Sequence, residues 1–149
     1  MLGKLRGLFQ DADYAFFEGS DELDSVVPGG IEAFKKLNPD DQESYRKQAI
    51  EGIRAECCKT QQVGVVTGHY SFWDAQADRV GPEVWTLADA NIYTRILYLD
   101  VSAEKILDIR QKDTSREREE LDLSSIQAWL VSEKTKLEHH CRAGGHFLP

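Results

Sequence analysis

Two carboxylates that follow an apolar run are the residues of this chain best placed to do chemistry. The run Tyr14–Phe17 is typical of a short buried strand, and Glu18, Gly19 and Asp21 come directly after it. Because glycine permits a sharp turn, both acids can be presented where a strand opens into a loop, to hold a metal ion or accept a substrate proton. The alternative is a solvated acidic turn, since charged residues are common at strand ends.

Other polar residues stand at comparable positions. Gly68 and His69 end the β-branched run Val63–Thr67, and open α/β sheets place ligands at such strand ends, although His69 could equally be a structural hydrogen-bond partner. Arg46 lies beside the apolar stripe of a predicted helix and could contact a substrate or only solvent. A charged tract, 110–122, could be a solvated segment or the arginine cluster that an anionic substrate would need. Its arginines are Arg110, Arg116 and Arg118.

The elements that must position these residues alternate between strands and helices. The apolar run Arg95–Val101 predicts another inner parallel strand. Asn38, followed by proline and two acids, is the best helix start, and a loop is expected at 24–30. We expect further helix starts at Thr86, Ser102 and Ser124, and a polar segment, 74–83, with Gly81-Pro82 as its turn. This alternation predicts an α/β fold with a parallel sheet covered by helices on both faces.

Five segments, in order, resemble the small-molecule P-loop kinases of the gluconate kinase and adenylylsulfate kinase type. Phe16–Leu23 resembles the Asp-Gly-Asp-Asp-Leu segment at the end of their second strand, and Asn38–Arg46 the start of a helix. Val63–His69 resembles the end of their third strand, Arg95–Val101 their fourth strand, and Arg110–Arg118 an arginine-bearing lid. The order and spacing hold over nearly the whole chain.

The resemblance implies a fold and a reaction. The fold is a parallel three-layer sheet, and the reaction transfers the γ-phosphate of ATP, with Mg²⁺, to a hydroxyl of a small metabolite. Glu18 or Asp21 would be the catalytic base or the metal-side carboxylate, and Arg46, Gly68 and His69 would bind the acceptor. The lid arginines would be Arg110, Arg116 and Arg118.

One expected motif does not occur in the sequence. The loop G-x-x-x-x-G-K-[ST], which holds ATP phosphates in these kinases, is absent from the 149 residues, and 1–9 resembles the helix that follows it. We therefore expect one domain, 1–149, truncated at the N-terminus and at the last strand, with a substrate-side loop at 24–38 and a lid-like segment at 110–122. Such a chain would be inactive alone and could dimerise through unpaired strands.

Composition limits the choice of partners and compartment. The net charge of −8 and the pI near 5.0 argue against nucleic-acid or anionic-membrane binding. The chain has neither an apolar run of transmembrane length nor a signal-peptide core, so the cytoplasm is the expected location. The cluster of His139, His140, Cys141 and His146 lacks the second ligand pair of a closed zinc site, so we expect no structural metal.

Three functions remain open on the sequence. The first is a small-molecule kinase whose phosphate loop lies outside this chain. The second is a non-catalytic module on a degenerate kinase fold that binds a small ligand or a protein. The third is a plain structural or interaction domain. The acceptor is unspecified, because sugar acids, nucleosides and sulfated nucleotides all suit two acids and several arginines.

Overall fold

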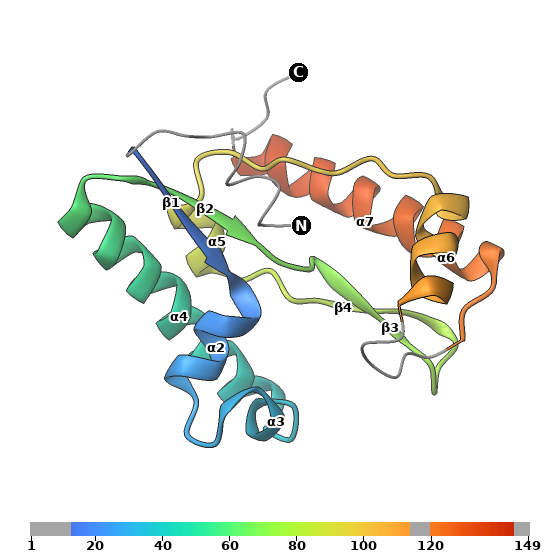
Figure 1. Ribbon diagram of the computed structural model, residues 1–149, viewed down its shortest axis with the longest axis horizontal. Helices are drawn as coiled ribbons and strands as arrows, with labels where there is room; N and C mark the ends of the chain where they lie inside the picture. Colours follow the sequence, from blue (N-terminus) through green and yellow to red (C-terminus); the bar gives the residue numbers. More distant parts are fainter. Residues whose placement is uncertain (1–12, 114–119, 145–149) are drawn as a thin grey trace. The chain divides into compact units, whose positions relative to one another are not determined.

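The computed structural model describes residues 13–113 and 120–144, which form two compact units (Figure 1). The first unit comprises the residues up to His69 together with Trp85–Tyr93. The second comprises Tyr70–Val84 together with the residues from Thr94 onward. Both mix strands with helices, so the chain has an α/β fold, and each unit is described by itself.

A parallel pair of strands forms the sheet of the first unit. Strand β1 spans Tyr14–Glu18 and β2 spans Val63–Thr67, with Tyr14 opposite Val63 and Glu18 opposite Thr67. Both strands had been predicted from their apolar, β-branched runs. Because the strands are parallel and in this register, their carboxyl ends lie at the same edge, side by side in Figure 1.

Helix α4, Pro39–Thr60, connects the two strands and begins as predicted. The Asn38 side chain accepts a hydrogen bond from the Asp41 amide at 2.9 Å, which satisfies one free donor of the first turn. Its apolar side buries Ala49, Ile50 and Ile53. Ile53 and Cys57 pack so closely on β2 that a side chain at position 64 would collide with the Cys57 sulfur, which accounts for Gly64.

Two short helices occupy part of the segment predicted as a loop. Helix α2 spans Gly19–Val26 and α3 spans Gly30–Phe34, so the break is confined to 27–29. The prediction of a loop from 24 was wrong because the polar residues that precede the break continue the helix. The Asp24 carboxylate accepts a hydrogen bond from the Ile31 amide at 2.8 Å and so joins the two helices. Gly29 and Gly30 have φ angles of 88° and 71°, which favour glycine.

Helix α5, Leu87–Ile92, completes the first unit and packs against α4. Thr86 and Asp89 form a reciprocal capping box, so the predicted helix start at Thr86 is confirmed. The rings of Trp85 and Tyr93 flank the helix with centroids 6.1 Å apart.

The second unit contains an antiparallel hairpin that the sequence had not predicted. Strand β3 spans Ser71–Asp74 and β4 spans Arg79–Glu83. Gly81-Pro82 lies inside β4 and is not the turn, which falls at 75–78 and includes Asp78 with a φ of 48°. Proline is tolerated there because a strand in a two-stranded sheet is an edge strand. Gly81 is required because a side chain would approach the Phe72 carbonyl to 2.9 Å.

Helices α6, Ala103–Lys112, and α7, Leu123–Gly144, pack together in the second unit. Ser102 caps α6 as predicted, through the Lys105 amide at 3.3 Å. At α7, however, the Asp122 carboxylate accepts from the Ser125 amide at 2.8 Å, so the predicted cap at Ser124 was wrong by two residues. Aspartate accepts more strongly than a serine hydroxyl because it is charged.

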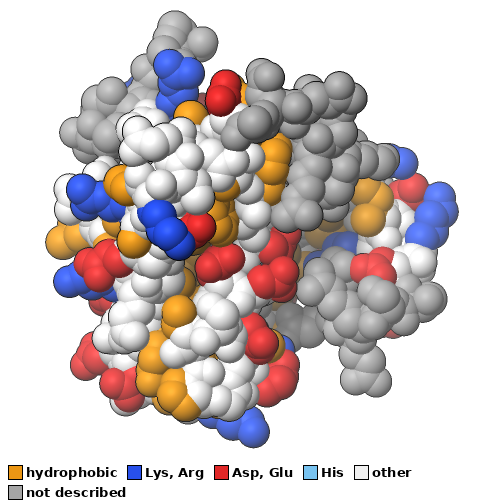
Figure 2. Space-filling view, turned by 60° about the vertical axis from the view of Figure 1, so that its left-hand side comes forward, with side chains coloured by type: hydrophobic (Ala, Val, Ile, Leu, Met, Phe, Trp, Pro, Cys, Tyr) orange, Lys and Arg blue, Asp and Glu red, His pale blue; other side chains and the backbone are white. Residues whose placement is uncertain are grey.

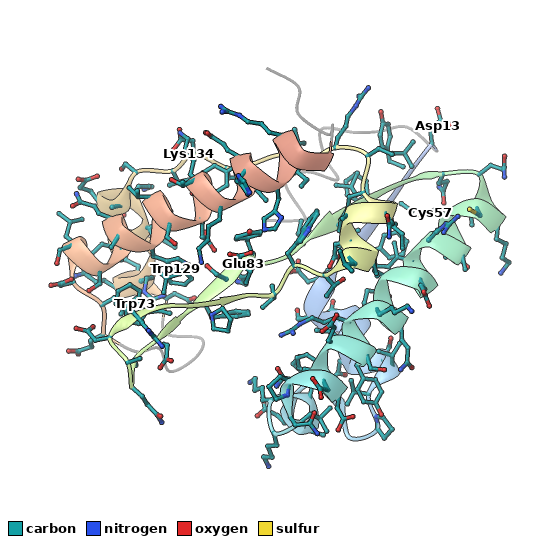
Figure 3. The ribbon with its side chains drawn as sticks, turned by 180° about the vertical axis from the view of Figure 1, so that it is seen from behind. Asp13, Cys57, Trp73, Glu83, Trp129 and Lys134 are labelled. Atoms are coloured by element: carbon teal, nitrogen blue, oxygen red, sulfur yellow. The ribbon has the colours of Figure 1, made fainter. Side chains whose placement is uncertain are left out.

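A polar network joins α7 to the hairpin. Ser71 is fully buried, and its amide and hydroxyl both donate to Glu133, at 3.0 and 2.9 Å. The Trp129 indole N–H donates to the Ser71 hydroxyl at 3.0 Å. Figure 3 shows Trp129 and Glu83 on the hairpin side of α7. Burying these groups is tolerable because they are hydrogen-bonded to one another.

The sheet differs from the predicted one. Among the described residues the strands pair two by two, as β1–β2 and β3–β4, and do not form a three-layer parallel sheet. The segment Arg95–Val101 is not in a strand ladder, although its apolar content predicted an inner strand. The prediction of an inner strand is not confirmed, because a strand needs a partner for its backbone groups as well as an apolar sequence, and the described residues provide none.

Candidate functional site

The carboxyl-terminal edge of β1 and β2 brings predicted site residues together. Glu18 is the last residue of β1 and lies opposite Thr67, the last residue of β2. The Thr67 hydroxyl donates to Glu18 Oε2 at 2.7 Å, and both side chains are partly buried. This bond fixes one oxygen of the Glu18 carboxylate. The carboxylate keeps further lone pairs that can accept other hydrogen bonds or bind a metal ion. Sequence reasoning missed Thr67, although its place at the end of the neighbouring predicted strand was a usable signal.

Glycine follows each of these two strands. A side chain on Gly19 would approach the Thr67 carbonyl to 3.1 Å, so the two strand ends are closely packed. A side chain on Gly68 would meet nothing within 4 Å, so the backbone there faces open space. Gly68 and the following His69 are both exposed. Open backbone at a strand end is accessible to a ligand.

Asp21 lies in the first turn of α2, three residues beyond Glu18, and is exposed. A carboxylate there is favoured by the positive end of the helix dipole. The Glu18 carboxylate, at the position before the helix, makes no capping bond to the α2 backbone and bonds across the sheet instead. Glu18 thus ends β1 and Asp21 lies in the helix that follows it directly, whereas the sequence predicted both acids where the strand opens into a loop.

Arg46 belongs to the helix that packs on β2. Arg46 precedes Ile53, the α4 residue that lies beside Gly64 of β2, by seven positions. Its guanidinium stacks on the Phe34 ring at 5.2 Å, a contact that the sequence did not reveal.

The electrostatic environment of Arg46 suits anion binding. The side chain is half-buried and makes no ion pair or side-chain hydrogen bond with a residue in 13–113 or 120–144. Burial lowers the pKa of the guanidinium, while Asp89 and Glu43 act in the opposite direction. Arginine stays charged in proteins, so Arg46 is a partly desolvated cation whose donors are available.

The predicted lid residues lie elsewhere in the chain. Arg110 belongs to α6 in the second unit. Arg116 and Arg118 lie outside the described residues.

The fit of Mg²⁺ and ATP can be tested on the donor groups. Glu18 and Asp21 offer the hard oxygen donors that Mg²⁺ takes one or two at a time, together with water and substrate phosphates. No group of three or more His, Cys, Asp and Glu side chains in the described ranges is arranged to hold a metal ion by itself. The described residues also include no glycine-rich phosphate cradle, so they fit Mg²⁺ as partial ligands and do not fit the ATP phosphates.

The surface around these elements mixes charge with apolar side chains. Acidic residues are spread over the face in Figure 2, with hydrophobic side chains between them. No helix within the described part of the chain is both long and apolar enough to cross a membrane.

Comparison with known proteins identifies a family for this chain. A search of curated proteins found no match to the sequence. A family model described as an AAA domain, AAA_17, matches residues 4–127, which is most of the 149-residue chain. The match covers the first unit's described elements and runs into α7. The chain therefore belongs to the AAA domain family AAA_17, a group of P-loop NTPase-like, kinase-like nucleotide-binding proteins.

Proposed function

We propose that this chain supplies the acceptor-binding part of a P-loop kinase that phosphorylates a hydroxyl of a small metabolite. The observation that carries the proposal is the register of β1 and β2, which places Glu18, Thr67 and Gly68 at one edge of a parallel sheet. Ligands of open α/β sheets bind at this edge. For the fold, we propose that β1 and β2 are two neighbouring strands of a parallel three-layer sheet of the kinase type.

Each proposed residue has a role that its position permits. Glu18 or Asp21 accepts the proton of the attacking hydroxyl, which a carboxylate can do once it lies within hydrogen-bond reach. Arg46 binds an anionic group of the acceptor, because its donors are available and partly desolvated. Gly68 and His69 line the open side of β2, where the acceptor can approach the backbone. Lid roles for Arg110, Arg116 and Arg118 rest on the sequence resemblance alone.

ATP with Mg²⁺ would supply the phosphoryl group and neutralise its charge. Since no G-x-x-x-x-G-K-[ST] string occurs in the sequence, the acceptor side is the part of the reaction that this chain can test. The expected partner is a small molecule in the cytoplasm.

Acceptor binding is the direct test. The full chain is titrated with sugar acids, nucleosides and sulfated nucleotides, followed by calorimetry and by amide chemical shifts of Gly19 and Gly68. We expect one class to bind and to shift both amides. Arg46→Gln should weaken that binding about tenfold or more, because charged hydrogen bonds are lost. Arg54→Gln, an exposed arginine on the same helix, is the matched control. If no class binds, or if both variants weaken binding equally, the proposal is wrong.

The second candidate is a ligand-binding module without catalysis. The missing phosphate-loop string favours it, since phosphoryl transfer depends on the positioning and charge stabilisation that this loop provides. Once an acceptor is known, its phosphorylation by the full chain with Mg-ATP separates the two. Turnover that is lost in Glu18→Gln supports the kinase, and binding without turnover supports the module.

A further inference from the structure

The segment Arg95–Val101 of the second unit belongs to no strand ladder, and its backbone makes few hydrogen bonds with the described residues. Within this stretch the Val101 amide donates to the Leu99 carbonyl at 2.9 Å, and no other backbone group of 95–101 bonds to a described residue. Most of its amides and carbonyls therefore have no backbone partner among the described residues, as on the edge of a sheet, and such an edge can recruit another strand.

The side chains of this strand alternate between two faces. Asp100 on one face makes an ion pair with Lys134 of α7 at 2.7 Å. Tyr98, on the same face, is partly buried, and burial together with the nearby Glu133 raises the pKa of its hydroxyl. Figure 3 shows Lys134 on the side of α7 away from Trp129, so the helix contacts the hairpin with one side and this strand with another.

The opposite face of the strand is apolar and open. Leu97 is 87% exposed and Leu99 51% exposed. Two adjacent exposed leucines on a strand with free backbone groups need both an apolar cover and a hydrogen-bonding partner. An extended apolar strand provides both at once.

We propose that this strand pairs with the same strand of a second copy of the chain, in antiparallel orientation about a two-fold axis. In such a pair, two residues that lie directly opposite each other point to the same face of the sheet. Because side chains alternate between faces along a strand, the numbers of opposite residues must differ by an even amount. The exposed leucine faces of the two copies therefore adjoin and form one apolar cluster.

The charges favour one register. When Leu97 faces Leu97 of the second copy, Ile96 faces Tyr98 and Asp100 faces Thr94. No like charges lie opposite, and the β-branched–aromatic pair is a favourable one. In the alternative register, in which Tyr98 faces Tyr98 of the second copy, Asp100 would face Ile96. That register is unfavourable because the carboxylate would be desolvated. Asp100 keeps its ion pair with Lys134 in the favoured register.

Sedimentation equilibrium of the full chain over a wide concentration range tests the proposal. We expect a monomer–dimer equilibrium, and Leu97→Glu should raise the dissociation constant about tenfold or more, since the contact occurs at the symmetry axis. Leu87→Glu alters another leucine, 80% exposed, on α5 and should leave the equilibrium unchanged. A monomer at every concentration, or a dimer that tolerates Leu97→Glu, overturns the proposal.

A cross-link tests the register without weakening the contact. In a Cys58→Ser background, which removes the exposed native thiol, Leu97→Cys should form an intermolecular disulfide on mild oxidation. Directly opposite residues have Cα atoms about 4.5–5.5 Å apart, within the range of a disulfide. Leu87→Cys in the same background is the control. Cross-linking at position 87 and not at 97 would contradict the pairing.

Discussion

At the scale of single residues, the hydrogen bond between Thr67 and Glu18 is the contact that most defines the candidate site. It joins side chains 49 positions apart, at 2.7 Å, across the ends of two parallel strands. A glutamate has several rotatable bonds, so a fixed donor on one carboxylate oxygen restricts where the other points. Thr67 is therefore expected to position Glu18 and not to contact the acceptor itself.

Thr67→Val keeps the shape of the side chain and removes its donor. We expect the free energy of unfolding to fall by about 1 kcal/mol, because the partly buried Glu18 carboxylate loses its partner. Thr67→Ser, which retains a hydroxyl, should recover much of the loss. Thr60→Val is the control, since the Thr60 hydroxyl bonds only to the local Glu56 carbonyl on an exposed turn. Urea unfolding measures all three, and equal losses in Thr67→Val and Thr60→Val would contradict the prediction.

Two glycines of the first unit should respond to alanine in opposite directions. Gly52 is exposed inside α4, and a side chain there meets nothing within 4 Å, so Gly52→Ala should stabilise the chain by about 0.5–1 kcal/mol. At Gly64 the added carbon would lie 2.8 Å from the Cys57 sulfur, so Gly64→Ala should destabilise by about 1 kcal/mol or more.

The double variant Gly64→Ala/Cys57→Ala isolates this contact. Removing the sulfur relieves the collision, so the double variant should be more stable than the sum of the two single changes predicts. Strict additivity in denaturant unfolding would show that the sulfur moves aside without cost.

At the scale of elements, the helix starts could be predicted from the sequence because they depend on residues within a few positions of one another. Asn38 and Ser102 were predicted as caps, and each accepts from the amide three residues on. The hairpin at 71–83 escaped prediction because its stability comes from packing against α7 through residues some 60 positions away, and Gly81-Pro82 resembles a turn. The contact of Arg46 with Phe34 escaped for the same reason, since side chains from two helices meet only once the chain is folded.

Acid should weaken the attachment of the hairpin to α7. Burial alone would raise the pKa of Glu83, but hydrogen bonds from His140 at 2.9 Å and Lys136 at 3.2 Å, with the Tyr70 hydroxyl adjacent, lower it below its usual value. That hydroxyl is buried and makes no hydrogen bond of normal geometry with a described residue. A carboxyl whose pKa is lower when folded stabilises the fold above its unfolded pKa, and this contribution disappears as the pH falls through the folded value.

The pH dependence of unfolding checks this. The wild type should lose stability on acidification from its unfolded glutamate pKa near 4.5 downward, and Glu83→Gln should lose less over that range while being less stable at neutral pH. Glu51→Gln, which alters an exposed carboxylate 3.9 Å from Lys47, controls for the change in net charge. If the free energy of unfolding depends on pH in the same way for the wild type and Glu83→Gln, the charge of Glu83 does not hold the hairpin to α7.

At the scale of the whole molecule, we expect the unpaired backbone of the described residues to limit stability. Within 13–113 and 120–144 each sheet consists of two strands, and a pair of strands is marginally stable by itself in water. The parallel character of β1 and β2 and the apolar run Arg95–Val101 were visible in the sequence. Which strands pair was not visible, because the hydrophobic pattern of a strand determines which face is buried and does not identify the neighbouring strand.

Stability and association should therefore be linked. If the strand Arg95–Val101 is satisfied only in the dimer, the midpoint of thermal unfolding rises with protein concentration, since mass action favours the associated native state. Each copy carries a charge of −8, so two copies repel at low ionic strength, and added salt should strengthen the dimer until screening is complete. Calorimetry at several concentrations and salt levels measures both trends, and Leu97→Glu should abolish the concentration dependence. A high midpoint that is independent of concentration would mean that the monomer is stable with this strand unpaired.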